Sequence, residues 1–168
     1  MKTKYFTHFS LFVLSITVLL TLMTSRATTS EICPISDSIY RDANGQGFEL
    51  VFGPPPVGSA VHGTAVIDHP QQAQLYQFRV FQSSGYGTVW LWDKDPNQPD
   101  NDWRFWIAFF DQDLTSATPL YLGAETEAPQ YAVVAGLGSH DHYQRRGSVT
   151  EETPPLLGDT MWIRDRCQ

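Results

Sequence analysis

Apolar and polar residues alternate along most of the chain, and this period of two constrains the fold more than any other feature. The alternation is clearest in Phe48–Phe52, Val61–Ile67 and Leu75–Phe81. In an extended strand, alternation sends successive side chains to opposite faces of a sheet. Shorter apolar segments follow at 88–92, 103–110, 119–123, 130–137 and 160–164. Glycine, proline, asparagine and aspartate separate these segments, so the sequence predicts an all-β fold of eight or nine short strands.

An antiparallel β-sandwich is the expected architecture, and a small β-barrel is the alternative. Both folds are typical of short strands joined by turns rich in glycine and proline. Apolar residues nowhere keep helical spacing for three turns. One short segment, Pro70–Phe78, competes as a helix, because Asp68 would cap it and Pro70 suits a first helical turn.

The first 27 residues have the layout of an export signal. Lys2 and Lys4 precede an apolar run of 15 residues, Phe9–Met23, and the small residues Ser25 and Ala27 form a cleavage site. The alternative is an uncleaved anchor, which needs about 20 apolar residues. We therefore expect a signal peptide at 1–27 and a single secreted β domain at 28–168, located in the periplasm, another lumen or the extracellular space. Stable membrane insertion after cleavage is not expected.

Cys33 and Cys167 are the only cysteines, one near the start of the expected mature chain and one beside its end. Thiols of exported proteins meet an oxidising compartment, where they form disulfide bonds. The sequence therefore predicts one disulfide that links the two ends of the domain.

The charge of the chain excludes some partners. The formal net charge is −7, from 11 basic and 18 acidic side chains. The expected leader contains three of the basic side chains and none of the acidic ones, so the remainder carries −10. Nucleic acids and anionic membrane surfaces are bound through clustered lysine and arginine, and neither partner is expected.

Four of the five tryptophans lie in two short segments, Trp90–Trp92 and Trp103–Trp106. Large aromatic side chains in neighbouring strands commonly fill a sandwich core. The functional alternative is an exposed platform that stacks on a sugar ring or another planar ligand. The residues expected to form that platform are Trp90, Trp92, Trp103 and Tyr86.

The segment between these strands is acidic. Its oxygen donors alternate in the way that lets a loop wrap a hard cation, so Ca²⁺ is the expected cofactor if one binds. The expected ligands are Asp93, Asp95, Asn97, Asp100 and Asp102, with Asp111 and Asp113 as further donors. An EF-hand is excluded, because Gln98 replaces its glycine and Arg104 its glutamate. A solvated acidic turn is the alternative to a looser calcium site.

Residues with catalytic chemistry are few. His140 and His142 would point the same way on an extended segment and share a metal, but Arg145 and Arg146 stand where a glutamate ligand would follow, so a surface loop is expected. No nucleophile elbow occurs. Two pairs of acidic residues could serve as the catalytic carboxylates of a glycosidase, Asp111 with Asp113 and Glu125 with Glu127.

Three classes of function follow from these observations. The leading hypothesis is a non-enzymatic exported module that binds carbohydrate through its aromatic platform. The second is an envelope structural or assembly protein that docks another protein through the same aromatics. The third is a hydrolase, for which the residues supply the least support.

Overall fold

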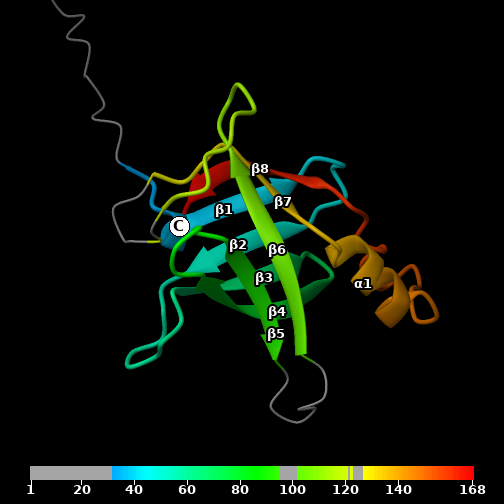
Figure 1. The fold of residues 1–168 in the computed structure, drawn as a ribbon. Helices are drawn as coiled ribbons and strands as arrows, with labels where there is room; N and C mark the ends of the chain where they lie inside the picture. Colours follow the sequence, from blue (N-terminus) through cyan, green and yellow to red (C-terminus); the bar gives the residue numbers. More distant parts are fainter. Residues whose placement is uncertain (1–31, 95–101, 121, 123–126) are drawn as a thin grey trace, which may run out of the picture. The chain divides into compact units, whose positions relative to one another are not determined.

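The computed structural model describes residues 32–94, 102–120, 122 and 127–168, which form a closed antiparallel barrel (Figure 1). The predicted signal peptide, residues 1–27, lies outside the described residues. The eight strands are β1 (Ser38–Asp42), β2 (Glu49–Gly53), β3 (Gly63–His69), β4 (Gln72–Gln82), β5 (Val89–Lys94), β6 (Asp102–Phe110), β7 (Tyr131–Val134) and β8 (Met161–Cys167).

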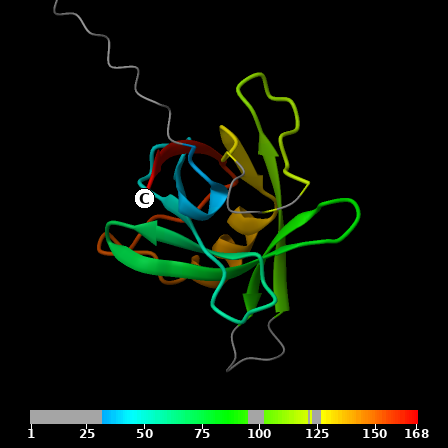
Figure 2. The same cartoon turned by 90° about the vertical axis from the view of Figure 1, so that its left-hand side faces the viewer.

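Each strand pairs with the next along the chain, and β8 pairs with β1 to complete the ring. The all-β antiparallel prediction is confirmed. Of the two architectures that the sequence left open, the structure has the barrel. β6 runs at a steep angle to β1 and β2, which is visible from two directions (Figure 1, Figure 2).

Side chains fill the barrel interior, because strands such as β2, β3 and β4 send alternate residues inward. In β4, for example, Phe78 and Val80 are buried while Arg79 is exposed. Eight strands enclose an interior just wide enough for such side chains. The largest fully buried members of this core are Trp162, Tyr40, Phe48, Phe52 and Phe109.

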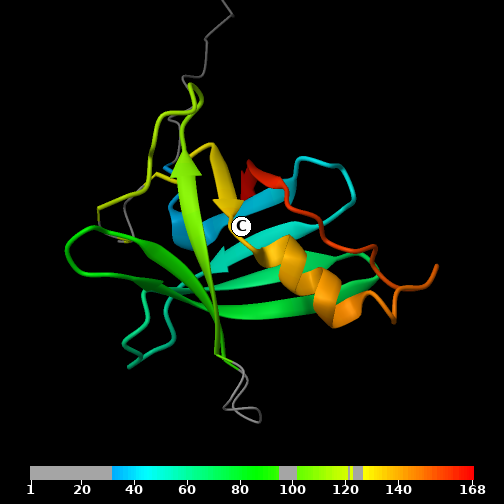
Figure 3. The ribbon, with the colours of Figure 1, turned by 45° about the vertical axis from the view of Figure 1, so that its right-hand side comes forward.

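One α-helix, α1 (Leu137–Arg145), connects β7 to β8. It corrects the expectation of a surface loop around His140. The competing helix at Pro70–Phe78 is not formed, because residues from Gln72 onward belong to β4. α1 lies beside one end of the ring of strands (Figure 3). No helix among the described residues has the length and apolar character needed to cross a bilayer.

The predicted disulfide between Cys33 and Cys167 is confirmed, with 5.8 Å between the two Cα atoms. Cys167 is also the last residue of β8, where it pairs with Ser38 of β1. The covalent link therefore lies at the seam that closes the barrel.

Candidate functional site

The outer face of β4, β5 and β6 carries two rows of side chains that cross the three strands. Arg79 pairs with Trp92, which pairs with Arg104. Directly opposed residues of antiparallel strands point to the same face, so Trp92 lies between two arginine residues on this face. The adjacent row is formed in the same way by Phe81, Trp90 and Trp106.

Contacts hold the Trp92 indole in place. The Arg104 guanidinium carbon lies 4.9 Å from the centre of the indole, within the range of a cation–π contact. Arg104 Nη2 also donates to Asp102 Oδ2 at 2.9 Å, and Trp92 Nε1 donates to the same carboxylate. The centres of the Phe81 and Trp92 rings lie 4.9 Å apart, with their planes tilted by 57°. Trp92 is therefore oriented by both neighbouring strands.

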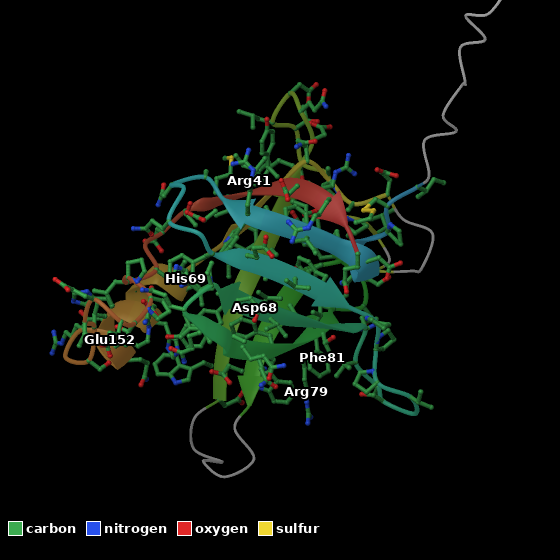
Figure 4. All side chains as sticks on the ribbon, turned by 180° about the vertical axis from the view of Figure 1, so that it is seen from behind. Arg41, Asp68, His69, Arg79, Phe81 and Glu152 are labelled. Carbon is green, nitrogen blue, oxygen red and sulfur yellow. A yellow bond between two sulfur atoms is a disulfide. The ribbon has the colours of Figure 1, made fainter. Side chains whose placement is uncertain are left out.

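A groove of about 410 Å³ runs over this face, lined by Phe81, Gln82, Ser83, Trp90, Trp92 and Arg104. Its volume is within the range of small-molecule sites. Three of the six lining residues are aromatic, and Ser83 and Arg104 add polar groups. The Gln82 amide is engaged within the protein, because it donates to the carbonyls of Gly87 and Pro119 and accepts from the backbone N–H of Leu122. Arg79 and Phe81 project from β4 on the outside of the barrel (Figure 4).

The structure brings together two of the four predicted platform residues. Trp90 and Trp92 line the groove. Trp103 lies on the inner face of β6, where it pairs with Asp93 and packs 4.9 Å from the ring of His140. Tyr86 lies in the turn between β4 and β5 and is 93% exposed. A single platform made of all four side chains is therefore not formed.

Sequence reasoning missed Phe81 and Arg104 as lining residues and Trp106 as their neighbour. Strand alternation alone places Arg104 and Trp106 on one face of β6. The missing information was the register that sets this face beside Trp92, because register depends on which residues pair across the strands.

The predicted calcium ligands fall largely outside the described residues, since 95–101 are not described. The two that are described, Asp93 and Asp102, project to opposite faces of the β5–β6 hairpin. Asp93 pairs with the inward-facing Trp103, whereas Asp102 contacts the outward-facing Arg104. Within the described part of the chain, no cluster of three or more potential metal ligands is found. The calcium site stays a prediction.

The side chains of His140 and His142 do not point the same way, as they would on an extended segment. Both lie in α1, where residues two apart point to different sides of the helix. His140 is buried and His142 is exposed. The ring of His140 contacts those of Tyr76, Trp103 and Phe105 at the end of the barrel.

The acidic pairs considered for hydrolysis have local roles where they are described. Asp111 and Asp113 both accept from the backbone N–H of Thr115 and so shape the turn after β6. The hydrogen bond with Asp113, followed by that with Thr115, lowers the pKa of Asp111. Glu127 forms an ion pair with Arg164, and Glu125 lies outside the described residues.

Comparison of the chain with protein-family models, curated proteins and solved structures finds no match.

Proposed function

We propose that the protein is an exported, non-enzymatic barrel that binds carbohydrate in the groove over β4, β5 and β6. The observation that carries this proposal is the pair of half-buried indoles, Trp90 and Trp92, on the wall of a ligand-sized groove. The second hypothesis, docking of another protein by the same face, becomes an outcome of the test.

The location of the groove agrees with the packing of the barrel. Small barrels commonly hold a ligand inside, but here bulky core side chains such as Trp162 and Phe109 occupy the interior. The same three strands leave the groove-lining indoles of Trp90 and Trp92 only partly buried on their outer face. An aromatic surface that folding does not bury is available to a ligand.

Stacking on a sugar ring suits this arrangement. Trp90 and Trp92 are two residues apart on one strand, so their Cα atoms are about 7 Å apart. Both indoles are only partly buried, so apolar ring surface stays accessible, and the exposed Ser83 supplies a polar group for a hydroxyl. A ligand with flat apolar faces and a polar circumference is complementary to such walls.

The test compares three indole variants for binding to a panel of neutral and acidic oligosaccharides by calorimetry. We expect Trp90→Ala and Trp92→Ala each to weaken binding about tenfold or more, because truncation of a buried aromatic anchor commonly costs over 1 kcal/mol. Trp106→Ala is the matched control: it removes an indole from the same face that does not line the groove, and it should bind as the wild type does.

Circular dichroism of each variant separates loss of binding from loss of fold. Equal binding by a folded Trp92→Ala protein would contradict the proposal. Absence of binding to every glycan would contradict it as well. In that case, recovery of a stoichiometric protein complex after cross-linking would favour the docking hypothesis.

A further inference from the structure

We infer that the groove selects a sugar that carries a negative charge, and that Arg79 binds the anionic group. This inference rests on the proposed function, since it names the class of sugar for the same groove. The ligand chemistry is a pyranose ring bearing a carboxylate or a sulfate.

The two arginines beside Trp92 differ in whether a carboxylate offsets their charge. Arg104 has its charge offset by Asp102, with 2.9 Å between Nη2 and Oδ2. The side chain of Arg79 is exposed and makes no hydrogen bond or ion pair with another side chain among the described residues. Arg79 does not itself line the groove, but it lies directly opposite the groove-lining Trp92 on the neighbouring strand. Its guanidinium is therefore available to an anionic group that extends beyond Trp92 from a ligand in the groove.

The cation of Arg79 has uncharged neighbours although the protein as a whole is acidic. The chain has a net charge of −7, yet Arg79 projects from β4 between Gln77 and Phe81, which are both uncharged. The adjacent row on the same face, formed by Phe81, Trp90 and Trp106, is also uncharged. A cation without a counter-charge next to the groove-lining Trp92 favours an anion that reaches it from the ligand.

These positions suggest how an acidic sugar binds. The ring stacks on the indoles of Trp90 and Trp92, and its anionic group extends across Trp92 toward β4. There the guanidinium of Arg79 donates two parallel N–H bonds to the oxygens, a geometry that suits carboxylate and sulfate alike. Arg104, which lies on β6 and not on β4, contacts the Trp92 indole and keeps it in place.

The experiment uses the disulfide-bonded protein and a pair of ligands that share their sugar rings and differ at the carboxyl group. Oligogalacturonate is compared with its fully methyl-esterified form, which keeps the rings and removes the carboxylate charge. We expect the acid to bind about tenfold more tightly than the ester at low salt, since a hydrogen bond between charged groups is stronger than a neutral one. This preference should shrink as salt screens the exposed cation.

Variants assign the preference to a residue. Arg79→Gln should abolish the preference for the acid and leave binding of the ester unchanged. Arg41→Gln is the matched control, because Arg41 is an exposed strand arginine that pairs with Asp165, away from the groove lining. It should keep the wild-type preference. A sulfated oligosaccharide with a desulfated counterpart tests the second source of charge in the same way.

Each outcome decides between the two proposals. Equal binding of acid and ester by the wild type would overturn the inference and leave carbohydrate binding intact. A preference for acid that survives Arg79→Gln would overturn the role of Arg79. Failure of the acid, the ester and every neutral glycan to bind would overturn the inference together with the proposed function.

Discussion

His140 is a titratable side chain enclosed at one end of the barrel. It is 8% exposed, and the centres of three aromatic rings lie within 6 Å of its own, at 5.7 Å for Tyr76, 4.9 Å for Trp103 and 5.1 Å for Phe105. Burial lowers the pKa of His140, and the negative charges of Asp93 and Asp141 oppose that shift only in part. The folded protein therefore favours the neutral imidazole.

This pKa shift predicts how stability depends on pH. A histidine in the unfolded chain titrates near pH 6.5, above its lowered pKa in the folded state. As the pH falls below about 6.5, the unfolded state takes up the proton first, so the free energy of unfolding falls toward the folded pKa. Above about pH 6.5 this contribution is fully present.

Denaturant unfolding between pH 7.5 and 5 measures this slope. We expect His140→Phe, which keeps an aromatic ring in the same enclosure, to flatten the pH dependence. His142→Gln changes an exposed histidine in the same helix and should keep the wild-type slope. An unchanged slope in His140→Phe would show that other groups carry the pH dependence.

At the scale of elements, α1 is held against the barrel by one buried carboxylate. Asp141 is fully buried and accepts hydrogen bonds from the Tyr76 hydroxyl at 2.6 Å and the backbone N–H of Leu157 at 2.7 Å. Arg145, one turn further along α1, donates to both oxygens of the same carboxylate. A buried charge needs such partners, and here they join α1 to β4 and to the segment before β8.

The close approach of α1 to the segment before β8 requires a glycine. A Cβ added at Gly138 would lie 2.4 Å from the backbone nitrogen of Asp159 and 2.5 Å from the carbonyl carbon of Gly158. Alanine ordinarily favours a helix over glycine by about 1 kcal/mol. We expect Gly138→Ala to be destabilising instead. It should lower the free energy of unfolding by about 2 kcal/mol through overpacking.

Gly147 offers a matched control just beyond the helix. A Cβ there meets nothing within 4 Å, so Gly147→Ala should be neutral or slightly stabilising, because alanine reduces the freedom of the unfolded chain. Urea unfolding of both variants makes the comparison. If the Gly138→Ala protein is as stable as the wild type or more stable, α1 can move away from the segment before β8.

Two elements were missed by sequence reasoning for identifiable reasons. In β1, three consecutive residues, Ser38, Ile39 and Tyr40, are buried, so the strand lacks the alternation that predicts strands elsewhere. The dipeptide Asn44-Gly45, a common hairpin signal, was the available cue. α1 begins after Gly136, which has a left-handed φ of 79° and no side-chain cap. Such a helix has little local support and depends on its tertiary contacts.

At the scale of the whole molecule, closure joins the two ends of the described chain twice. β1 and β8 pair through five registered residues from Ser38 to Asp42. The disulfide spans 134 positions of sequence at the same seam. The hydrogen-bonded ladder exists only in the folded state, whereas the disulfide also restricts the unfolded chain.

Removal of the disulfide should therefore lower stability while the barrel still forms. We expect the double variant Cys33→Ser/Cys167→Ser to lose about 2 to 5 kcal/mol in the free energy of unfolding, since a long closed loop is released in the unfolded state. Thermal unfolding measures the loss, and far-ultraviolet circular dichroism checks that the β spectrum persists. An unchanged melting temperature would contradict the expectation.

The sequence by itself determined the all-β class, the antiparallel short strands and the pairing of the two cysteines. These properties follow from local alternation, from turn residues and from the presence of only two thiols. Only the tertiary structure decided that the sheet closes into a barrel, that residues 137–145 form a helix and that Trp92 lies beside Arg79 and Arg104 while Trp103 faces inward. Each of these depends on register or packing between segments distant in sequence, and the alternation within one strand carries no information about which residue will lie opposite in another.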